Sequence, residues 1–250
     1  MEILSGKYTL CLCDGAFPLS TDSMVLADFV RLPASARVLD LGSGCGTLGL
    51  LLCAADERCA VTGVELTDAA HNAALKNIRA NGLENRLYSI CADLRAMPPE
   101  ILPGGFDVCV SNPPYFSGGE ASRRTPLARR DDFCSPEALF AAAARALRFG
   151  GDFYLVHKPQ MLARLCALGG ANGLEAKRLR LIRHREGGDI ALILLQFRKG
   201  GKPGLVLEEN CLFHPDGLPA ARSRPPMPFT AKMRSSVGRR CMSAPMCGKN

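Results

Sequence analysis

The sequence predicts an α/β protein whose mostly parallel sheet carries helices on both faces. Short apolar segments alternate with longer helix-forming segments along the chain, which is typical of a parallel sheet. Residues 37–55 have the pattern of strand, glycine turn and helix, the first unit of a doubly wound nucleotide-binding fold. The last two expected strands are separated only by Glu186-Gly187-Gly188, which indicates a hairpin. We therefore expect a seven-stranded sheet with one antiparallel strand.

The expected elements follow from apolar spacing and from the residues that begin and end helices. Thr21 suits the N-cap of the first helix, and Gly150-Gly151 is expected to end the last one. Strands are expected near residues 37–41, 60–65, 86–91, 106–111, 151–157, 176–183 and 189–197. Helices are expected near residues 22–31, 47–55, 68–81 and 135–148.

A glycine loop directly follows the first strand. Gly42, Gly44 and Gly46 let the backbone turn sharply and come close to a ligand. Their spacing is G-x-G-x-G rather than the G-x-G-x-x-G that cradles a pyrophosphate. Asp40 stands just before the loop, where a carboxylate disfavours a diphosphate and favours a cationic ligand. S-adenosylmethionine carries an ammonium and a sulfonium, so it fits this charge pattern better than NAD does.

Two further acids stand at the ends of the next strands. Glu65 ends the second strand about 20 residues beyond the glycine loop, where a ribose diol is usually held. Asp93 follows the third strand, and its carboxylate can accept a hydrogen bond from an adenine amino group. Either acid alone is more simply an exposed loop carboxylate. Three acids and one glycine loop at successive strand ends favour a nucleotide-like ligand.

The segment Asn112-Pro113-Pro114-Tyr115 follows the fourth strand, at the edge where open α/β sheets bind their ligands. The Asn112 side-chain oxygen accepts hydrogen bonds, and the Pro113 carbonyl is an acceptor with no competing N–H. The two prolines stiffen the loop, and Tyr115 offers a flat face on which a base can stack. A Pro-Pro pair after a strand can also be a simple turn. Next to the glycine loop, the segment predicts a site that holds a planar amine.

With these features in register, the chain resembles the class I S-adenosylmethionine-dependent methyltransferases, and among them the amino-methyltransferases. More narrowly, it resembles the bacterial enzymes that methylate adenine N6 in the anticodon loop of a valine tRNA. The stretches similar to that family's lead-in helix, basic stretch and late basic strand are residues 19–30, 123–131 and 176–180.

The similarity runs from about Tyr8 to Phe213, with two departures. Asp131 stands where the family more often has Glu, and the chain beyond Phe213 differs from the family's ending. The resemblance implies a Rossmann-like class I methyltransferase fold, with S-adenosylmethionine as the methyl donor, S-adenosylhomocysteine as the product and no metal.

The same resemblance assigns roles to particular residues. A target base would be turned out of the RNA to reach the pocket. The residues expected to be catalytic are Asn112, Pro113, Pro114 and Tyr115. The residues expected to bind the cofactor are Asp40, Gly42, Ser43, Gly44, Gly46, Glu65, Leu66, Asp93 and Asn112.

The net charge of +7 lies mostly beyond Phe213, where seven of the 31 basic residues but only one of the 24 acidic residues are found. An RNA surface on the rest of the chain must therefore be a local patch, and either candidate patch could instead be a solvated charged face. The residues expected to bind RNA are Arg123, Arg124, Arg129, Arg130, Lys177 and Arg178, with Arg180, Arg183 and Arg185 extending the second patch.

Length and composition predict one domain, residues 1–213, followed by a basic tail rich in Pro, Arg and Ser, residues 214–250, and the resemblance implies that the domain is a methyltransferase domain. The tail lacks sustained periodicity and is expected to be disordered. It could be an RNA-binding arm or the product of a late reading-frame change. The chain has no run of about 18 apolar residues and no signal-like N-terminus, so we expect no association with a membrane. The resemblance implies tRNA as the partner, and we expect a monomeric, cytoplasmic protein.

The 12 cysteines do not predict a disulfide framework or a metal site. Cys11-x-Cys13 lacks a second pair or a histidine at zinc-site spacing. Free cysteines in apolar runs act as small hydrophobes, which fits a reducing compartment. The cysteines in such runs are Cys53, Cys59, Cys91 and Cys109.

Other substrates and a non-enzymatic function stay open. Glutamine side chains of release factors present a similar planar amide, but their methyltransferases carry an N-terminal helical domain, and only 36 residues precede the first strand here. Guanine N2 of ribosomal RNA is a weaker alternative because Phe commonly replaces Tyr115 there, and DNA adenine would need a target-recognition domain. A cofactor-binding RNA chaperone is the non-enzymatic alternative. Methylation of adenine N6 in tRNA is the leading hypothesis.

Overall fold

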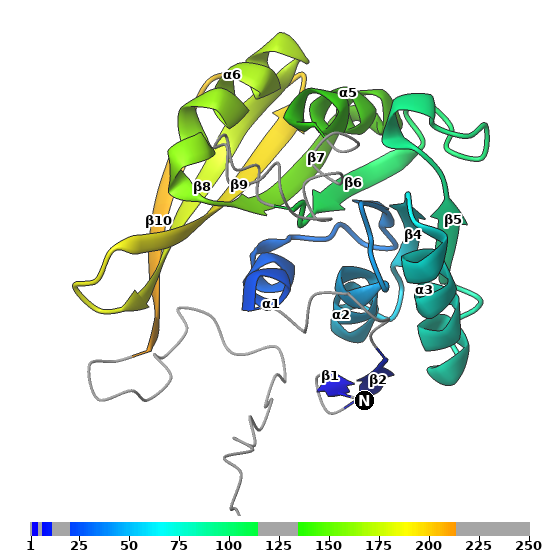
Figure 1. Cartoon of the computed structure of the whole chain (residues 1–250). Coiled ribbons are helices and arrows are strands. Elements are labelled where there is room, and N and C mark those ends of the chain that lie inside the picture. Colours follow the sequence, from blue (N-terminus) through cyan, green and yellow to red (C-terminus); the bar gives the residue numbers. More distant parts are fainter. Residues whose placement is uncertain (1, 5–6, 12–20, 115–134, 214–250) are drawn as a thin grey trace, which may run out of the picture.

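A twisted sheet of eight strands forms the centre of the protein, with helices on both faces (Figure 1). The computed structural model describes residues 2–4, 7–11, 21–114 and 135–213. The predicted fold class is confirmed. In spatial order, the strands are β10 (Val206–Phe213), β8 (Leu174–Arg185), β9 (Ile190–Lys199), β7 (Leu147–His157), β6 (Phe106–Ser111), β3 (Arg37–Leu41), β4 (Ala60–Glu65) and β5 (Leu87–Cys91).

The single reversed strand is β9, which runs antiparallel to both of its neighbours, β7 and β8. The other neighbouring pairs in this sheet are parallel. The strand not predicted is β10, which pairs with β8 at the edge of the sheet. Glu208, Glu209 and Asn210 interrupt its apolar character, so its sequence does not resemble a buried strand.

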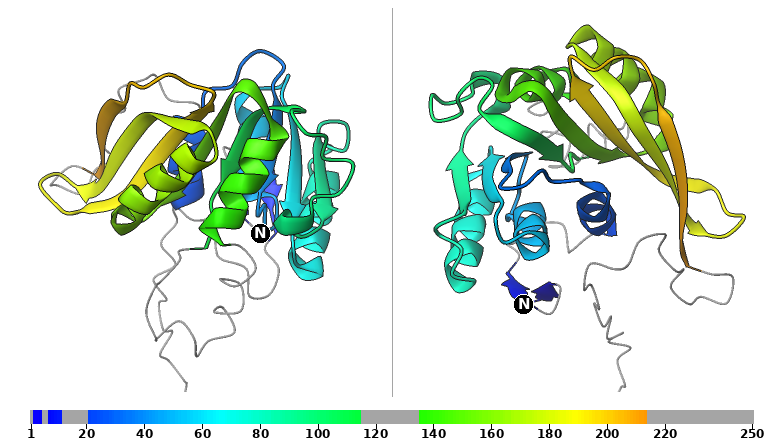
Figure 2. Two further views of the ribbon diagram at one scale, coloured as in Figure 1. Left: turned by 90° about the horizontal axis from the view of Figure 1, so that it is seen from above. Right: turned by 180° about the vertical axis from the view of Figure 1, so that it is seen from behind.

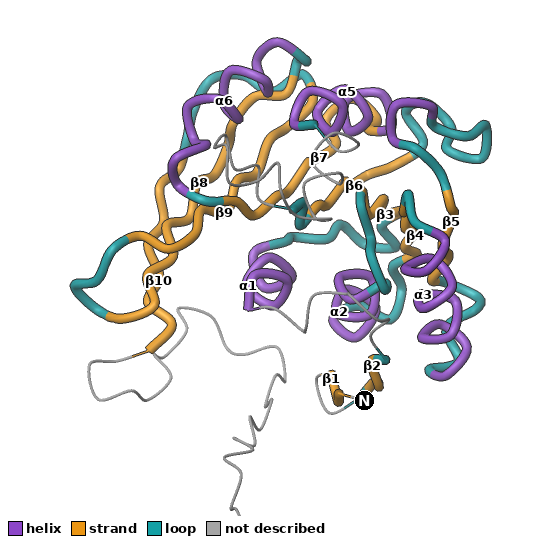
Figure 3. Tube along the Cα trace, viewed as in Figure 1, coloured by secondary structure: helices purple, strands orange, loops and turns teal. Residues whose placement is uncertain are grey.

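Two helical layers cover the sheet (Figures 2 and 3). On one face lie α1 (Thr21–Phe29), α2 (Thr47–Ala55) and α3 (Asp68–Ala80), and on the other lie α5 (Pro136–Ala146) and α6 (Leu162–Ala171). Short 3₁₀ turns are η1 (Leu94–Ala96) and η3 (Pro159–Met161), and a small hairpin pairs β1 (Glu2–Leu4) with β2 (Tyr8–Leu10).

Alternation along the strands divides the core into two halves. Val38 and Val108 pack with the α1 and α2 side chains, whereas Leu39 and Cys109 pack with the α5 and α6 side chains. Such two-sided burial is expected of parallel strands covered by helices on both faces. In the part of the chain that the structure describes, no helix is long and apolar enough to cross a membrane, and no cluster of three or more His, Cys, Asp or Glu could hold a metal.

Several boundary predictions are wrong. Helix α5 ends at Ala146 and β7 begins at the next residue, so Gly150-Gly151 lies inside a strand rather than at a helix end. Thr21 is the first residue of α1 rather than its N-cap.

Helix α6 was not predicted, because Gly169 and Gly170 lower its helix propensity. Gly169 is required there by packing, since a Cβ at this position would lie 2.5 Å from the Phe197 ring.

Cysteine burial follows the prediction with one exception. Cys53, Cys59 and Cys109 are buried in the core. Cys91 is exposed at the end of β5, with its sulfur 3.3 Å from a carboxylate oxygen of Asp68. The eight cysteines among the described residues are free thiols.

Candidate active site

The predicted cofactor-binding residues gather where β3, β4, β5 and β6 end, because parallel strands bring their carboxyl ends to one edge of the sheet. Leu41 in β3 lies opposite Val64 in β4, one residue before Glu65. The Ser111 hydroxyl at the end of β6 donates a 2.7 Å hydrogen bond to the Leu41 carbonyl. The glycine loop, Glu65 and Asn112 therefore leave the sheet next to one another.

The glycine loop has the backbone geometry that its sequence predicts. Gly42, Gly44 and Gly46 have φ angles of 76°, 55° and 81°, in the left-handed region that favours glycine. The amides of Gly42 and Ser43 both donate to the Val64 carbonyl, at 2.9 and 3.0 Å. The loop is thus fastened to β4 as it turns into α2.

Gly63, inside β4, gives the loop the space it needs. A Cβ on Gly63 would lie 2.6 Å from the Ser43 hydroxyl oxygen and 2.7 Å from the Ser43 Cβ. Both distances are well below normal contact, so a larger residue would push the loop away from the sheet. The sequence pattern did not single out this glycine.

Glu65, the last residue of β4, also holds the glycine loop in place. Its Oε2 accepts a 3.0 Å hydrogen bond from the Gly44 amide, and its Oε1 accepts hydrogen bonds from the Thr67 amide and hydroxyl, at 2.9 and 2.7 Å. A carboxylate has about four lone-pair sites, so these three bonds orient the group and leave acceptor capacity for ligand hydroxyls. Its position is the one predicted for a ribose contact.

Asp40 is a buried acid with one carboxylate oxygen that lacks a hydrogen-bond partner from the residues that the structure describes. It is 2% exposed, and among the described residues its Oδ2 has no hydrogen-bond partner. Burial, reinforced by the nearby Glu65, raises the pKa of Asp40 to about 7, against a hydrogen bond from the Gly49 backbone. The Ser43 hydroxyl is likewise buried without a partner in the described part of the chain. An acid and a hydroxyl in this condition fit a cationic, hydrogen-bonding ligand such as S-adenosylmethionine.

Asp93 and Leu66 lie at the same edge with different surroundings. Asp93 caps η1 by accepting from the Arg95 amide at 2.8 Å, and it also forms a 2.5 Å ion pair with the Arg95 side chain. Its predicted adenine contact would therefore share the carboxylate with Arg95. Leu66 is 38% exposed and offers an apolar surface beside Glu65.

Asn112 directly follows β6, and its side chain is held by a residue far away in the sequence. The Asn112 Nδ2 donates a 2.9 Å hydrogen bond to the Ser23 hydroxyl, which lies 89 residues earlier, in the first turn of α1. Pro113 is buried and Pro114 is partly buried, so the start of the loop packs against the fold. The stretch 19–30 resembled the family's lead-in helix, but its pattern did not connect Ser23 with Asn112.

The remaining predicted residues divide into two groups. Tyr115, Arg123, Arg124, Arg129 and Arg130 lie outside the described residues. Lys177 and Arg178 are both in β8.

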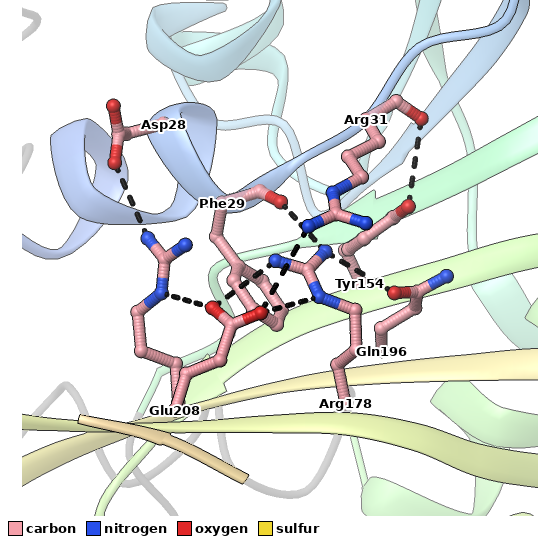
Figure 4. A network of polar contacts seen from close by, with 8 residues as sticks. Asp28, Phe29, Arg31, Tyr154, Arg178, Gln196 and Glu208 are labelled. Carbon is pink, nitrogen blue, oxygen red and sulfur yellow. Dashed lines mark hydrogen bonds and ion pairs between the residues drawn. The ribbon is translucent and has the colours of Figure 1, made fainter. Parts of the chain in front are cut away.

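The burial of Arg178 argues against its predicted contact with RNA. It is only 6% exposed, and its guanidinium donates 2.9 and 3.2 Å hydrogen bonds to Glu208 (Figure 4). Alternation along β8 and the pairing with β10 turn this side chain toward α1 rather than toward solvent. We therefore leave Arg178 out of the proposed RNA surface.

Comparison with known families matches residues 18–167 to the methyltransferase small domain. The chain belongs to this family. It is 32% identical over 207 residues to a tRNA1(Val) (adenine(37)-N6)-methyltransferase of Tolumonas auensis, covering 80% of this chain and 84% of the relative. A relative of the same name from Bacteroides fragilis is 28% identical over 188 residues, covering 73% of this chain and 77% of the relative.

Solved structures agree with the fold. A predicted O-methyltransferase of Agrobacterium tumefaciens superposes with a TM-score of 0.65 at 23% identity, covering 78% of this chain and 89% of that one. Family membership makes this methyltransferase an enzyme that uses S-adenosylmethionine. The buried Asp40 and the glycine loop are the part of the structure that fits this cofactor.

Proposed function

We propose that this methyltransferase transfers a methyl group from S-adenosylmethionine to the exocyclic N6 of an adenine in tRNA, the anticodon-loop adenine of a valine tRNA. The names of the similar curated proteins support the substrate. The structural observation that carries the proposal is the position of Asn112-Pro113-Pro114 at the end of β6, beside the glycine loop. This arrangement suits a planar amine presented to a cofactor at the same sheet edge.

Asn112 and Pro113 supply the electrostatic part of the mechanism. An adenine amino nitrogen is a poor nucleophile, because its lone pair is delocalised into the ring. The Asn112 Oδ1 and the Pro113 carbonyl each accept one amino hydrogen, which orients the nitrogen and stabilises the positive charge that develops on it. The bound cofactor supplies an electrophilic methyl group on its sulfonium.

Positioning accounts for most of the remaining rate enhancement. The stiff Pro-Pro segment and the braced glycine loop hold the two binding sites at a fixed separation. After transfer, the methylated nitrogen is acidic and loses its proton to water, so no strong general base is required. This route needs neither a metal nor a covalent intermediate.

RNA recognition is proposed to use residues beyond the loop. Tyr115 stacks on the flipped adenine, and the basic residues contact the backbone. The arginines and lysine of the predicted second patch that are less buried than Arg178 are Lys177, Arg180, Arg183 and Arg185. The proposed basic residues after the loop are Arg123, Arg124, Arg129 and Arg130.

We further propose residues 1–213 as the methyltransferase domain and residues 214–250 as a basic tail. On this proposal the enzyme acts as a monomer on tRNA in the cytoplasm. Chromatography with light scattering tests the oligomeric state, and removal of residues 214–250 tests whether the tail contributes to tRNA affinity.

The test of the function is methyl transfer from labelled S-adenosylmethionine to unmodified total tRNA, with purified release factor in parallel. Digestion to nucleosides should place the label in N6-methyladenosine, and Asn112→Ala should abolish it. Label in the release factor alone would overturn the RNA substrate while keeping the role of Asn112. No label in either substrate would contradict the proposed function.

A further inference from the structure

The side-chain amide of Asn112 has two ends with opposite hydrogen-bonding character. The oxygen accepts hydrogen bonds, whereas the NH₂ group only donates them. A rotation of half a turn about the last side-chain bond would present donors to an amine that also donates, and the catalytic contact would be lost. Whatever fixes this rotation is therefore part of the catalytic machinery.

Ser23 is placed to fix it. Its hydroxyl oxygen lies 2.9 Å from the Asn112 Nδ2 and accepts that group's hydrogen. Ser23 is only 7% exposed, so water competes little for this contact. With the NH₂ end bound to Ser23, the oxygen is turned away from α1.

The helix that carries Ser23 is itself firmly attached at its other end. Asp28 accepts a 3.2 Å hydrogen bond from Arg180, and the Phe29 carbonyl accepts a 3.3 Å bond from Arg178 (Figure 4). The guanidinium groups of Arg178 and Arg180 lie over the Phe29 ring, at 4.2 and 4.9 Å from its centroid. Glu208 of β10 bridges the two arginines, at 2.9 and 2.8 Å. Helix α1 therefore spans from the sheet edge at β8 and β10 to the catalytic loop.

We propose that Ser23 is a positioning residue for methyl transfer, which holds the Asn112 amide in the orientation that turns its oxygen toward the target amine. This inference rests on the proposed function, because it gives Ser23 a role through Asn112. Helix α1 contains neither the glycine loop nor the catalytic segment, yet on this proposal it contributes Ser23 to the active site.

The kinetic test compares Ser23→Ala and Ser23→Thr with the wild type. Ser23→Ala should lower kcat on tRNA about tenfold, which corresponds to the roughly 1.4 kcal/mol of one lost orienting hydrogen bond. The equilibrium Kd for S-adenosylmethionine should change less than about twofold, since the glycine loop is untouched. Ser23→Thr restores the hydroxyl and should recover most of the rate.

Ser89→Ala is the matched control. It removes one serine hydroxyl that is 2.8 Å from His71 Nδ1, on the far strand β5, and it should leave kcat within about twofold of the wild type. If Ser23→Ala keeps the wild-type kcat, or loses cofactor affinity as strongly as it loses rate, the proposal is wrong.

A second measurement does not depend on the substrate. The ¹⁵N–¹H signals of the Asn112 side-chain amide can be assigned by their disappearance in Asn112→Ala. In the wild type, the amide proton should be shifted downfield and exchange slowly with solvent, and Ser23→Ala should reverse both properties. Unchanged signals in Ser23→Ala would overturn the proposal even if the true substrate is not tRNA. Absence of methylation with normal signals would instead count against the proposed function alone.

Discussion

Two regions of the molecule bury charge in opposite ways. At the carboxyl edge of the sheet, Asp40 is buried with no cation beside it among the described residues, and its pKa is raised to about 7. Beside α1, Arg178 is nearly as buried, but its guanidinium donates to Glu208, Gln196 and the Phe29 carbonyl. Burial alone would raise the pKa of Glu208, yet hydrogen bonds from Arg178 and Arg180 outweigh it and hold that pKa below its usual value.

This difference in partners distinguishes a ligand-binding site, at Asp40, from a structural ion-pair network, at Arg178 and Glu208. A buried charge without a partner costs free energy that a ligand of opposite charge can recover. A buried charge whose partners are all within the chain has nothing left to recover, so it stabilises one arrangement of the elements. Substitutions at the two regions should therefore affect different measurements.

The largest effect is expected at the catalytic loop. Asn112→Ala removes the acceptor for the target amine and should lower kcat about a thousandfold, or roughly 4 kcal/mol of transition-state stabilisation. The Kd for S-adenosylmethionine, measured by calorimetry, should stay within a few-fold of the wild type. Unchanged turnover would contradict the proposed mechanism.

Breaking the ion-pair network beside α1 should lower the free energy of unfolding. Glu208→Ala leaves the buried Arg178 without its carboxylate and should lower the free energy of unfolding by about 3 kcal/mol in urea titrations. Glu209→Ala, which removes the exposed ion pair with Arg183, is the matched control and should cost less than about 1 kcal/mol. Equal losses in the two variants would show that the buried network does not anchor the edge strand.

Gly63→Ala should weaken cofactor binding by a steric effect alone. The new methyl group would collide with Ser43 and displace the glycine loop, so S-adenosylmethionine should bind about thirtyfold more weakly, or roughly 2 kcal/mol. Gly170→Ala is the control, because a Cβ there meets no atom within 4 Å in helix α6. Its cofactor affinity should equal that of the wild type, and a similar loss in both variants would argue against the Ser43 contact.

The smallest effect is a pH dependence at Asp40. Because its pKa is raised to about 7, the carboxyl is increasingly protonated below neutral pH and then attracts a cationic ligand less. Affinity for S-adenosylmethionine should fall about tenfold between pH 8 and pH 6, beyond any change in the ligand itself. Asp40→Asn should bind weakly with only the ligand's own pH dependence. Identical pH profiles for the two proteins would show that Asp40 does not titrate in this range.

Elements with strong local patterns were predicted closely. The strand Arg37–Leu41, the helix Thr47–Ala55 and the strand Phe106–Ser111 match their predicted limits, because apolar runs and glycines mark both ends. Elements with mixed patterns were missed. Helix α6 contains two glycines, of which packing against Phe197 requires Gly169, and β10 is a partly exposed edge strand whose Glu208 pairs with Arg178, 30 positions earlier.

The sequence by itself determined the fold class and the chemistry of the site. A glycine loop, acids at strand ends and Asn112-Pro113-Pro114 are local features, and parallel strands necessarily bring them to one edge. Only the tertiary structure decided that the buried Arg178 has Glu208 as its partner, that the buried Asp40 Oδ2 has none among the described residues, and that Asn112 is held by Ser23. Hydrogen bonds between residues 30 and 89 positions apart leave no periodic pattern in the chain, so no reading of local sequence could have found them.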